Sequence, residues 1–234
     1  MGIKIKRRLL DIIFPKFCLN CRKEGSYLCY DCQSLIEISG FHRQYSSQNL
    51  DDLYFAADYR NPLIEKTIRC FKYEPFAREL AETLSFLIIT HFQLMDNKPD
   101  FFPLSESGEK TADFIIIPVP LHKKRLKWRG FNQAEELSKE LAAFFGLPLF
   151  LNCLIRTKET FPQVVLSHQA RHENVKGAFS TGNKEIIENN NILLVDDIFT
   201  TGSTMEECAG FLKAAGAKKV IGLVVARGWN KPRD

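Results

Sequence analysis

The segment Val195-Asp-Asp-Ile-Phe-Thr-Thr-Gly-Ser-Thr204 decides the fold, because it joins an apolar strand to a helix through two acids and a turn of small residues. The run Ile192–Val195 is wholly apolar, which is typical of a strand buried on both faces of a parallel sheet. Asp196 and Asp197 are expected to end this strand. Ser203-Thr-Met-Glu206 has the Ser-x-x-Glu spacing of a capping box and predicts that a helix begins here. Open parallel sheets bind ligands at the carboxyl ends of their strands, so the segment predicts a binding site.

The turn that follows the acids, residues 200–204, predicts a pocket for a phosphate monoester. Its backbone N–H groups and hydroxyls face the positive end of a helix dipole, which favours an anion. Because no lysine follows Gly202, the turn differs from the phosphate loop of ATPases and GTPases. Asp196 and Asp197 would repel a triphosphate, but they suit a ribose diol and a magnesium shell. An acidic turn followed by an ordinary helix cap is the alternative interpretation.

The rest of the chain alternates between apolar strands and helical patterns, which predicts an α/β fold. Strands are expected at residues 53–59, 114–119, 192–195 and 220–226. Helices are expected within residues 62–92, where Pro75 divides them, and at residues 133–145 and 203–215. A loop is expected at residues 96–113. Together these elements predict a mainly parallel sheet with helices on both faces.

The composition is that of a globular protein with one full domain and a small appendage. The 234 residues include 32 basic and 28 acidic side chains, and the net charge of +4 does not by itself indicate nucleic acid. No run approaches the roughly 18 apolar residues of a membrane span. The opening stretch, residues 1–14, has a short apolar part and no cleavage site, so we expect a cytoplasmic protein. Residues 1–45 are expected to form the appendage and residues 50–234 the domain, with a polar linker at residues 42–52.

Positive charge concentrates in the segment Pro118–Gln133, directly after the predicted strand at residues 114–119. Its cationic residues are Lys123, Lys124, Arg125, Lys127 and Arg129. Cationic side chains stabilise a departing pyrophosphate, and the planar arginine fork suits two phosphate oxygens together. Because Trp128 and Phe131 are interleaved, the same stretch is also typical of a surface for single-stranded nucleic acid. A solvated basic loop is the third interpretation.

A long connection from Arg156 to Phe179 has no clear periodicity. Connections of this length are often lids over active sites. A lid here would exclude water from a reactive ribosyl cation. The segment contains Arg171, a candidate to close over a bound anion.

Four of the seven cysteines fall in two Cys-x-x-Cys pairs, Cys18–Cys21 and Cys29–Cys32, separated by seven residues. Two such pairs present four thiolates, the ligand set of a structural zinc site. The spacer is shorter than the roughly 15 to 20 residues usual in zinc ribbons, so a tight hairpin must bring the pairs together. A redox-active pair and an iron–sulfur cluster are the alternatives. The other three cysteines lie in apolar contexts and are expected in the core.

These segments together resemble the ComF family, competence-associated proteins with a phosphoribosyltransferase domain and often a Cys-rich head. The resemblance covers the head, Pro-Val-Pro-Leu-His at 118–122, Arg-Gly-Phe-Asn-Gln at 129–133, a Gln…Arg…Asn…Gly-Ala-Phe series and the segment at 195–204. That last segment is similar to the phosphoribosyl pyrophosphate loop of type I phosphoribosyltransferases. The resemblance implies a type I phosphoribosyltransferase-like fold with a small N-terminal zinc-ribbon-like module, and a link to DNA uptake.

The resemblance also implies residue roles. The ribose hydroxyls would be held by Asp196 and Asp197. The 5′-phosphate would be held by Thr200, Thr201, Gly202, Ser203 and Thr204. We therefore expect a magnesium-dependent phosphoribosyltransferase, in which magnesium bridges the diol and the pyrophosphate. The pyrophosphate would be stabilised by Lys123, Lys124 and Arg125, and Arg171 would close over the site. The alternatives are a non-catalytic competence accessory that holds single-stranded DNA or a partner protein, and a regulator that senses phosphoribosyl pyrophosphate without turnover.

Overall fold

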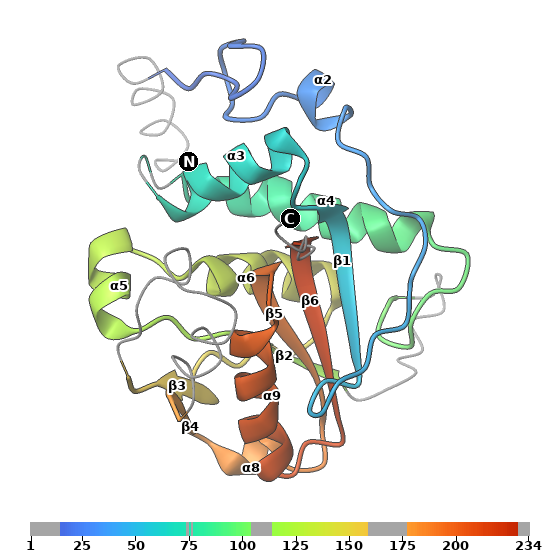
Figure 1. Ribbon diagram of the computed structural model, residues 1–234, viewed down its shortest axis with the longest axis vertical. Helices are drawn as coiled ribbons and strands as arrows, with labels where there is room; N and C mark the ends of the chain where they lie inside the picture. The colour runs from blue at the N-terminus through green and yellow to red at the C-terminus, as the bar shows by residue number, and fades with distance from the viewer. Residues whose placement is uncertain (1–14, 74, 76, 104–113, 159–176, 229–234) are drawn as a thin grey trace, which may run out of the picture.

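The computed structural model describes residues 15–73, 75, 77–103, 114–158 and 177–228 (Figure 1). Within these ranges the largest sheet has four strands in the order β1-β6-β5-β2, and every neighbouring pair is parallel. The strands are β1 (Asp52–Asp58), β2 (Phe114–Pro118), β5 (Asn191–Phe199) and β6 (Lys219–Arg227). The predicted parallel sheet and its four strands are confirmed.

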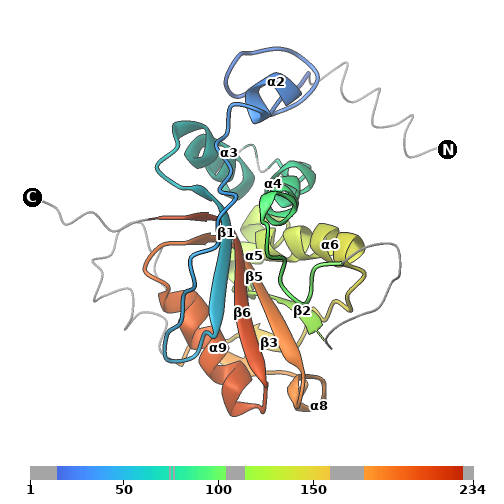
Figure 2. The same cartoon turned by 90° about the vertical axis from the view of Figure 1, so that its right-hand side faces the viewer.

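Helices cover both faces of this sheet (Figure 2). One face carries α3 (Pro62–Lys72), α4 (Leu80–Leu94) and α6 (Gln133–Phe145), and the other carries α9 (Ser203–Ala214). Successive side chains of β5 point to opposite faces of the sheet, so the core has two parts. Leu193 and Val195 pack on the α4 side, whereas Ile192 and Leu194 pack on the α9 side. The predicted break near Pro75 is confirmed by the gap between α3 and α4.

The helices begin and end where their local sequence requires. Asn61 accepts hydrogen bonds from the N–H groups of the first turn of α3, and Pro62 occupies its first position. Asn132 caps α6 in the same way. Gly146 ends α6 in the left-handed conformation, with a φ of 65°. The predicted helix at residues 133–145 is therefore confirmed with its stop signal.

The polar stretch at residues 42–52, predicted as a linker, contacts the domain at several positions although more than half of its residues are exposed; we call it the strap. The Tyr45 ring lies edge-on to Phe199, with centroids 5.4 Å apart. The N–H of Asn49 donates to Oε2 of Glu206 at 3.3 Å. The strap therefore binds the first turn of α9 through polar groups, while other polar side chains of the strap, such as Arg43 and Gln48, are exposed.

Some elements were not predicted. Residues Lys123–Arg129 form α5, where the sequence predicted no helix and a solvated basic loop was one of three interpretations. Short strands β3 (Leu154–Arg156) and β4 (Phe179–Thr181) pair antiparallel at the two ends of the predicted lid. Short helices α2 (Tyr30–Gln33) and α8 (Lys184–Ile187) complete the described elements. Residues 159–176 of the predicted lid, including Arg171, lie outside the described residues. Among the helices described, none has both the length and the apolar character to cross a membrane.

Candidate functional site

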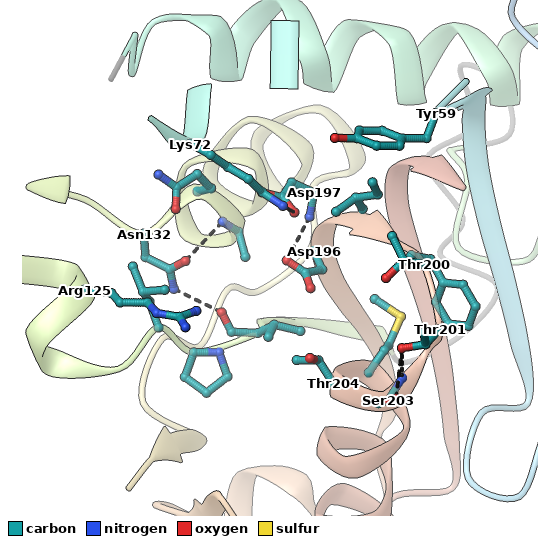
Figure 3. A pocket seen from close by; sticks show the side chains of 18 of the residues that line it. Tyr59, Lys72, Arg125, Asn132, Asp196, Asp197, Thr200, Thr201, Ser203 and Thr204 are labelled. Carbon is teal, nitrogen blue, oxygen red and sulfur yellow. Dashed lines mark hydrogen bonds and ion pairs between the residues drawn. The ribbon is translucent and has the colours of Figure 1, made fainter. Parts of the chain in front are cut away.

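A pocket of about 600 Å³ opens at the carboxyl ends of β5 and β2. This is the edge at which an open parallel sheet binds its ligands. The predicted phosphate turn and acidic pair both line it, as do residues from α3, α5 and α6 (Figure 3). Its charged lining residues are Glu65, Arg69, Lys72, Arg125, Arg129, Arg156, Asp196 and Asp197. Five cations face three anions, so the pocket favours an anionic ligand.

The turn at residues 200–204, predicted to hold phosphate and called the phosphate turn below, leads into a helix as the sequence predicts, and α9 begins within it at Ser203. Gly202 has a φ of 79°, and a Cβ atom there would lie 2.5 Å from the Phe199 ring. The position therefore requires glycine. The Thr201 and Ser203 hydroxyls are 2.9 Å apart, and Ser203 is only 1% exposed. N–H groups and hydroxyls thus converge at a helix start.

The predicted capping box is wrong, although the helix start is right. Gly202 is the cap residue and makes no side-chain hydrogen bond to the helix. The carboxylate of Glu206 binds the strap, accepting hydrogen bonds from Ser47 Oγ and the Asn49 N–H. Because the strap supplies these donors, Glu206 does not turn back toward the start of its own helix.

The two acids occupy different sides of β5, which continues past them to Phe199 instead of ending there. Asp197 follows Val195 on the α3 and α6 side and is 3% exposed. Asp196 follows Leu194 on the α9 side. Figure 3 shows Asp196 between Asp197 and the phosphate turn. The N–H of Asp197 donates to Oδ1 of Asp196 at 2.9 Å, so the pair is a fixed unit.

Lys72, the last residue of α3, contacts this pair and was missed in the sequence. Its Nζ lies 2.8 Å from Oδ1 of Asp197. Burial alone would lower the pKa of Lys72, but Asp197 and Asp196 outweigh burial and the net shift is upward. Burial, followed by the charge of Asp197, raises the pKa of Asp196 to about 7. A helix-terminal lysine forms no motif, so its role depends on where α3 packs.

The predicted cations are only partly brought into the pocket. Arg125 lines it together with Arg129, four residues further along α5 and on the same helix face. Lys123 and Lys124 are exposed and are not among the lining residues. Arg156, at the end of β3, is 8% exposed and lines the pocket. Burial and then the nearby Arg125 lower the pKa of Arg156, so two guanidinium groups lie near enough to repel.

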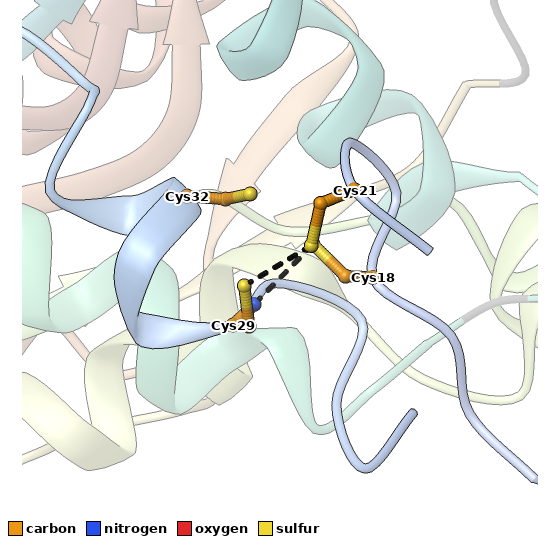
Figure 4. A group of neighbouring side chains, drawn as sticks. All are labelled: Cys18, Cys21, Cys29 and Cys32. Carbon is orange, nitrogen blue, oxygen red and sulfur yellow. Dashed lines mark hydrogen bonds between the residues drawn. The ribbon is translucent and has the colours of Figure 1, made fainter. Parts of the chain in front are cut away.

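The four predicted metal ligands converge (Figure 4). The Sγ atoms of Cys18, Cys21, Cys29 and Cys32 all lie within 4.8 Å of one another. Zinc–sulfur bonds of about 2.3 Å would place tetrahedral sulfurs about 3.8 Å apart, so the set fits this metal. An antiparallel bridge between Phe17 and Glu24 closes the loop that contains Cys18 and Cys21. The Cys29 N–H donates to Sγ of Cys18 at 3.5 Å, a contact that would stabilise a thiolate ligand.

The sequence relatives of the chain are competence and DNA utilization proteins. A family model described as the phosphoribosyl transferase domain matches residues 127–233. Competence protein ComFC of Bacillus subtilis is 31% identical over 223 residues, which cover 89% of this chain and 83% of that protein. The chain belongs to the ComF family. Its domain has the type I phosphoribosyltransferase-like α/β fold, with the four-cysteine module near the N-terminus.

Other ComF relatives match over a shorter region. Competence protein F of Haemophilus influenzae is 40% identical over 106 residues, 45% of this chain and 46% of that protein. DNA utilization protein YhgH of Escherichia coli K12 is 35% identical over 105 residues, 45% of each. The chain thus spans about half the length of these two relatives. Among solved structures, glutamine phosphoribosylpyrophosphate amidotransferase of B. subtilis is 19% identical to this chain, with a TM-score of 0.35. The match covers 63% of this chain and 25% of the amidotransferase chain. That likeness transfers no residue's role.

Proposed function

We propose that the protein binds phosphoribosyl pyrophosphate with magnesium and transfers the phosphoribosyl group to an acceptor, in a cytoplasmic process linked to DNA uptake. One observation carries the proposal: an acidic pair and a phosphate turn at a helix start line the same pocket. The names of the competence relatives support the link to DNA uptake.

The pocket offers a partner for each part of the ligand. The 5′-phosphate binds the turn at residues 200–204, and the ribose diol binds Asp196 and Asp197. The pyrophosphate binds Arg125, assisted by Arg129 and Arg156, which the structure adds to the predicted set. Lys123 and Lys124 act only at longer range, by attracting the anion. Closure by Arg171 stays a prediction from the sequence.

The acidic pair also fits magnesium, because hard cations prefer carboxylate oxygens. When bound, magnesium would neutralise charge on the pyrophosphate as it departs. In the transfer, the bond from the anomeric carbon to the pyrophosphate oxygen breaks and its electron pair stays on pyrophosphate. The acceptor nitrogen supplies the new bond and loses its own proton to solvent. The chain's contribution is positioning and electrostatic stabilisation.

Calorimetric titration with phosphoribosyl pyrophosphate and magnesium tests the proposal. We expect the Asp196→Asn/Asp197→Asn variant to bind at least about 100-fold more weakly, since two charge-assisted contacts are lost. Lys124→Gln, outside the pocket, serves as the control. Unchanged affinity in the double variant would remove both the enzyme and the sensor interpretations. Binding without pyrophosphate release across a panel of nucleobases would favour the sensor.

Aromatic and cationic side chains beside the pocket support a second candidate function, binding of single-stranded nucleic acid. Trp128 is 57% exposed, and the Arg129 guanidinium lies 5.4 Å from the Tyr73 ring centroid and 6.0 Å from that of Trp128. Bases stack on such platforms, and the binding depends on salt. Oligonucleotide affinity that is lost in Trp128→Ala but retained in Asp196→Asn would establish this function. Affinity unchanged in Trp128→Ala would exclude the platform.

We also propose that the four cysteines hold structural zinc. The head buries few apolar side chains, so a metal would contribute much of its folding free energy. Metal analysis of the purified protein should find one zinc per chain. Iron with visible absorption would favour the iron–sulfur alternative, and reversible disulfides without metal would favour the redox alternative.

A further inference from the structure

Lys72 is held in place by two different parts of the fold. Within α3, the neighbouring Ile68 and Phe71 are fully buried in the core on the α4 side. The carbonyl of Phe71 accepts a hydrogen bond from Nε2 of Gln133 at 3.2 Å, which ties the end of α3 to the start of α6. The backbone of Lys72 is therefore fixed before any ligand binds.

The Lys72 side chain is directed at the acidic pair (Figure 3). Its Nζ lies 2.8 Å from Oδ1 of Asp197, with the two side chains 22% and 5% exposed. The other cation in the last turn of α3, Arg69, is 67% exposed and lies 3.6 Å from Glu65 on its own helix. Only one of the two cations in this turn therefore contacts the acids.

This contact makes the acidic pair asymmetric. Asp197 lines the pocket but is 3% exposed and has a cation on one oxygen, whereas Asp196 lies on the other side of β5, beside the phosphate turn. Two adjacent buried carboxylates would repel each other and resist ionisation. Lys72 supplies one positive charge to the pair and holds Asp197 at a fixed position. A sugar that reaches the pocket thus meets the Asp197 carboxylate, whose charge Lys72 already neutralises, and the Asp196 carboxylate, which has no such ion pair with Lys72.

We propose that Lys72 is a positioning residue of the sugar site, acting through Asp197 as a resident cation for the acidic pair. Because Lys72 already supplies a positive charge to the acidic pair, the ribose diol binds without a divalent metal. Binding of the pyrophosphate group still requires the metal. This inference rests on the proposed function, because it assumes that the pair holds a ribose. It predicts that ribose 5-phosphate, which lacks pyrophosphate, binds equally well with magnesium and with EDTA.

Calorimetry with ribose 5-phosphate tests this inference, using the full chain in EDTA and then in magnesium. We expect wild-type affinities within about threefold of each other, and a loss of at least about tenfold in Lys72→Met, as for a charge-assisted contact. Lys72→Arg should recover most of the loss because it retains the cation. Lys66→Met removes an exposed cation of α3 that does not line the pocket, and it should bind like wild type.

The outcomes separate this inference from the function on which it rests. If wild type binds neither ribose 5-phosphate nor phosphoribosyl pyrophosphate, the proposed function fails and the inference fails with it. If wild type binds and Lys72→Met binds equally well, only the inference fails. It also fails if wild type needs magnesium for ribose 5-phosphate, or if Lys72→Arg is as weak as Lys72→Met.

Loss of one member of a buried ion pair can unfold a protein. If Lys72→Met is too unstable to purify, Lys72→Met/Asp197→Asn removes both charges and should restore the thermal unfolding midpoint toward that of wild type. Its affinity for ribose 5-phosphate should still be at least about tenfold weaker. Wild-type affinity in this folded double variant would overturn the inference.

Discussion

Replacing Asp196 with asparagine should stabilise the protein at alkaline pH. The pKa of the Asp196 carboxyl rises from 3.8 to about 7 on folding, first because of burial and then because of Asp197. A carboxyl with a higher pKa in the folded state favours folding while it is protonated. Its contribution is complete below about pH 4 and is lost as the pH rises to about 7.

The size of the effect follows from that shift. A rise from 3.8 to about 7 corresponds to a penalty of at most about 4 kcal/mol once the carboxyl is ionised. Asparagine carries no charge and can still accept the hydrogen bond that the Asp197 N–H donates to Oδ1. Asp196→Asn should therefore match wild type only below about pH 4, and the excess in its stability should grow with pH to a few kcal/mol near pH 8.5.

Urea denaturation of both proteins from about pH 5 to pH 8.5, without ligand, measures this difference. Subtracting the free energy of unfolding of wild type from that of the variant at each pH removes the contributions of the other titrating groups and leaves that of Asp196. Asp197→Asn is the matched control with the opposite sign, because it leaves Lys72 buried without its partner and should destabilise the protein by about 3 kcal/mol or more. A difference that does not change with pH, or an Asp196→Asn variant less stable at pH 8.5, would refute the reasoning.

Four other predictions follow from the site and the head. Affinity for phosphoribosyl pyrophosphate and magnesium should rise roughly tenfold from pH 6 to pH 8 as Asp196 ionises, and calorimetry at both values would show a flat profile if it does not. Gly202→Ala should cost about 1–3 kcal/mol in urea denaturation and weaken ribose 5-phosphate binding, because of its positive φ and the Phe199 ring. Cys18→Ser should lower zinc content by metal analysis, whereas Cys153→Ser, in the core, should keep it. Glu206→Ala should destabilise the chain by about 1–3 kcal/mol and speed hydrogen exchange in the strap; unchanged exchange would contradict the packing described.

The parallel sheet could be predicted because each strand has an apolar, largely buried central run, and the helices between the strands have start and stop residues in their own sequence. Asn61 with Pro62 and Gly146 with Pro148 are local signals, and local signals are visible in a sequence. The segment α5 could not be predicted in this way. It is seven residues long and has no buried side chain, so it lacks the apolar periodicity that identifies a helix.

The contrast between local sequence signals and tertiary packing also explains which residues of the candidate site could be predicted. The turn at residues 200–204 and the adjacent acids are contiguous, so their chemistry could be inferred from their order alone. Lys72 and Arg156 reach the pocket from elements far away in the chain, and only tertiary packing brings them there. Because no helix was predicted at residues 123–129, the sequence did not reveal which cations face the pocket; helical spacing places Arg125 and Arg129 on one side.

The strap determines where the chain can be cut. A fragment that starts at residue 50, the predicted start of the domain, would lack the Tyr45 ring beside Phe199 and the two donors that bind Glu206. Removing the cysteine head at that point would therefore leave the back of the phosphate turn open to water. Activity lost in such a fragment would say nothing about the metal, and a fair comparison has to retain the chain from His42 onward.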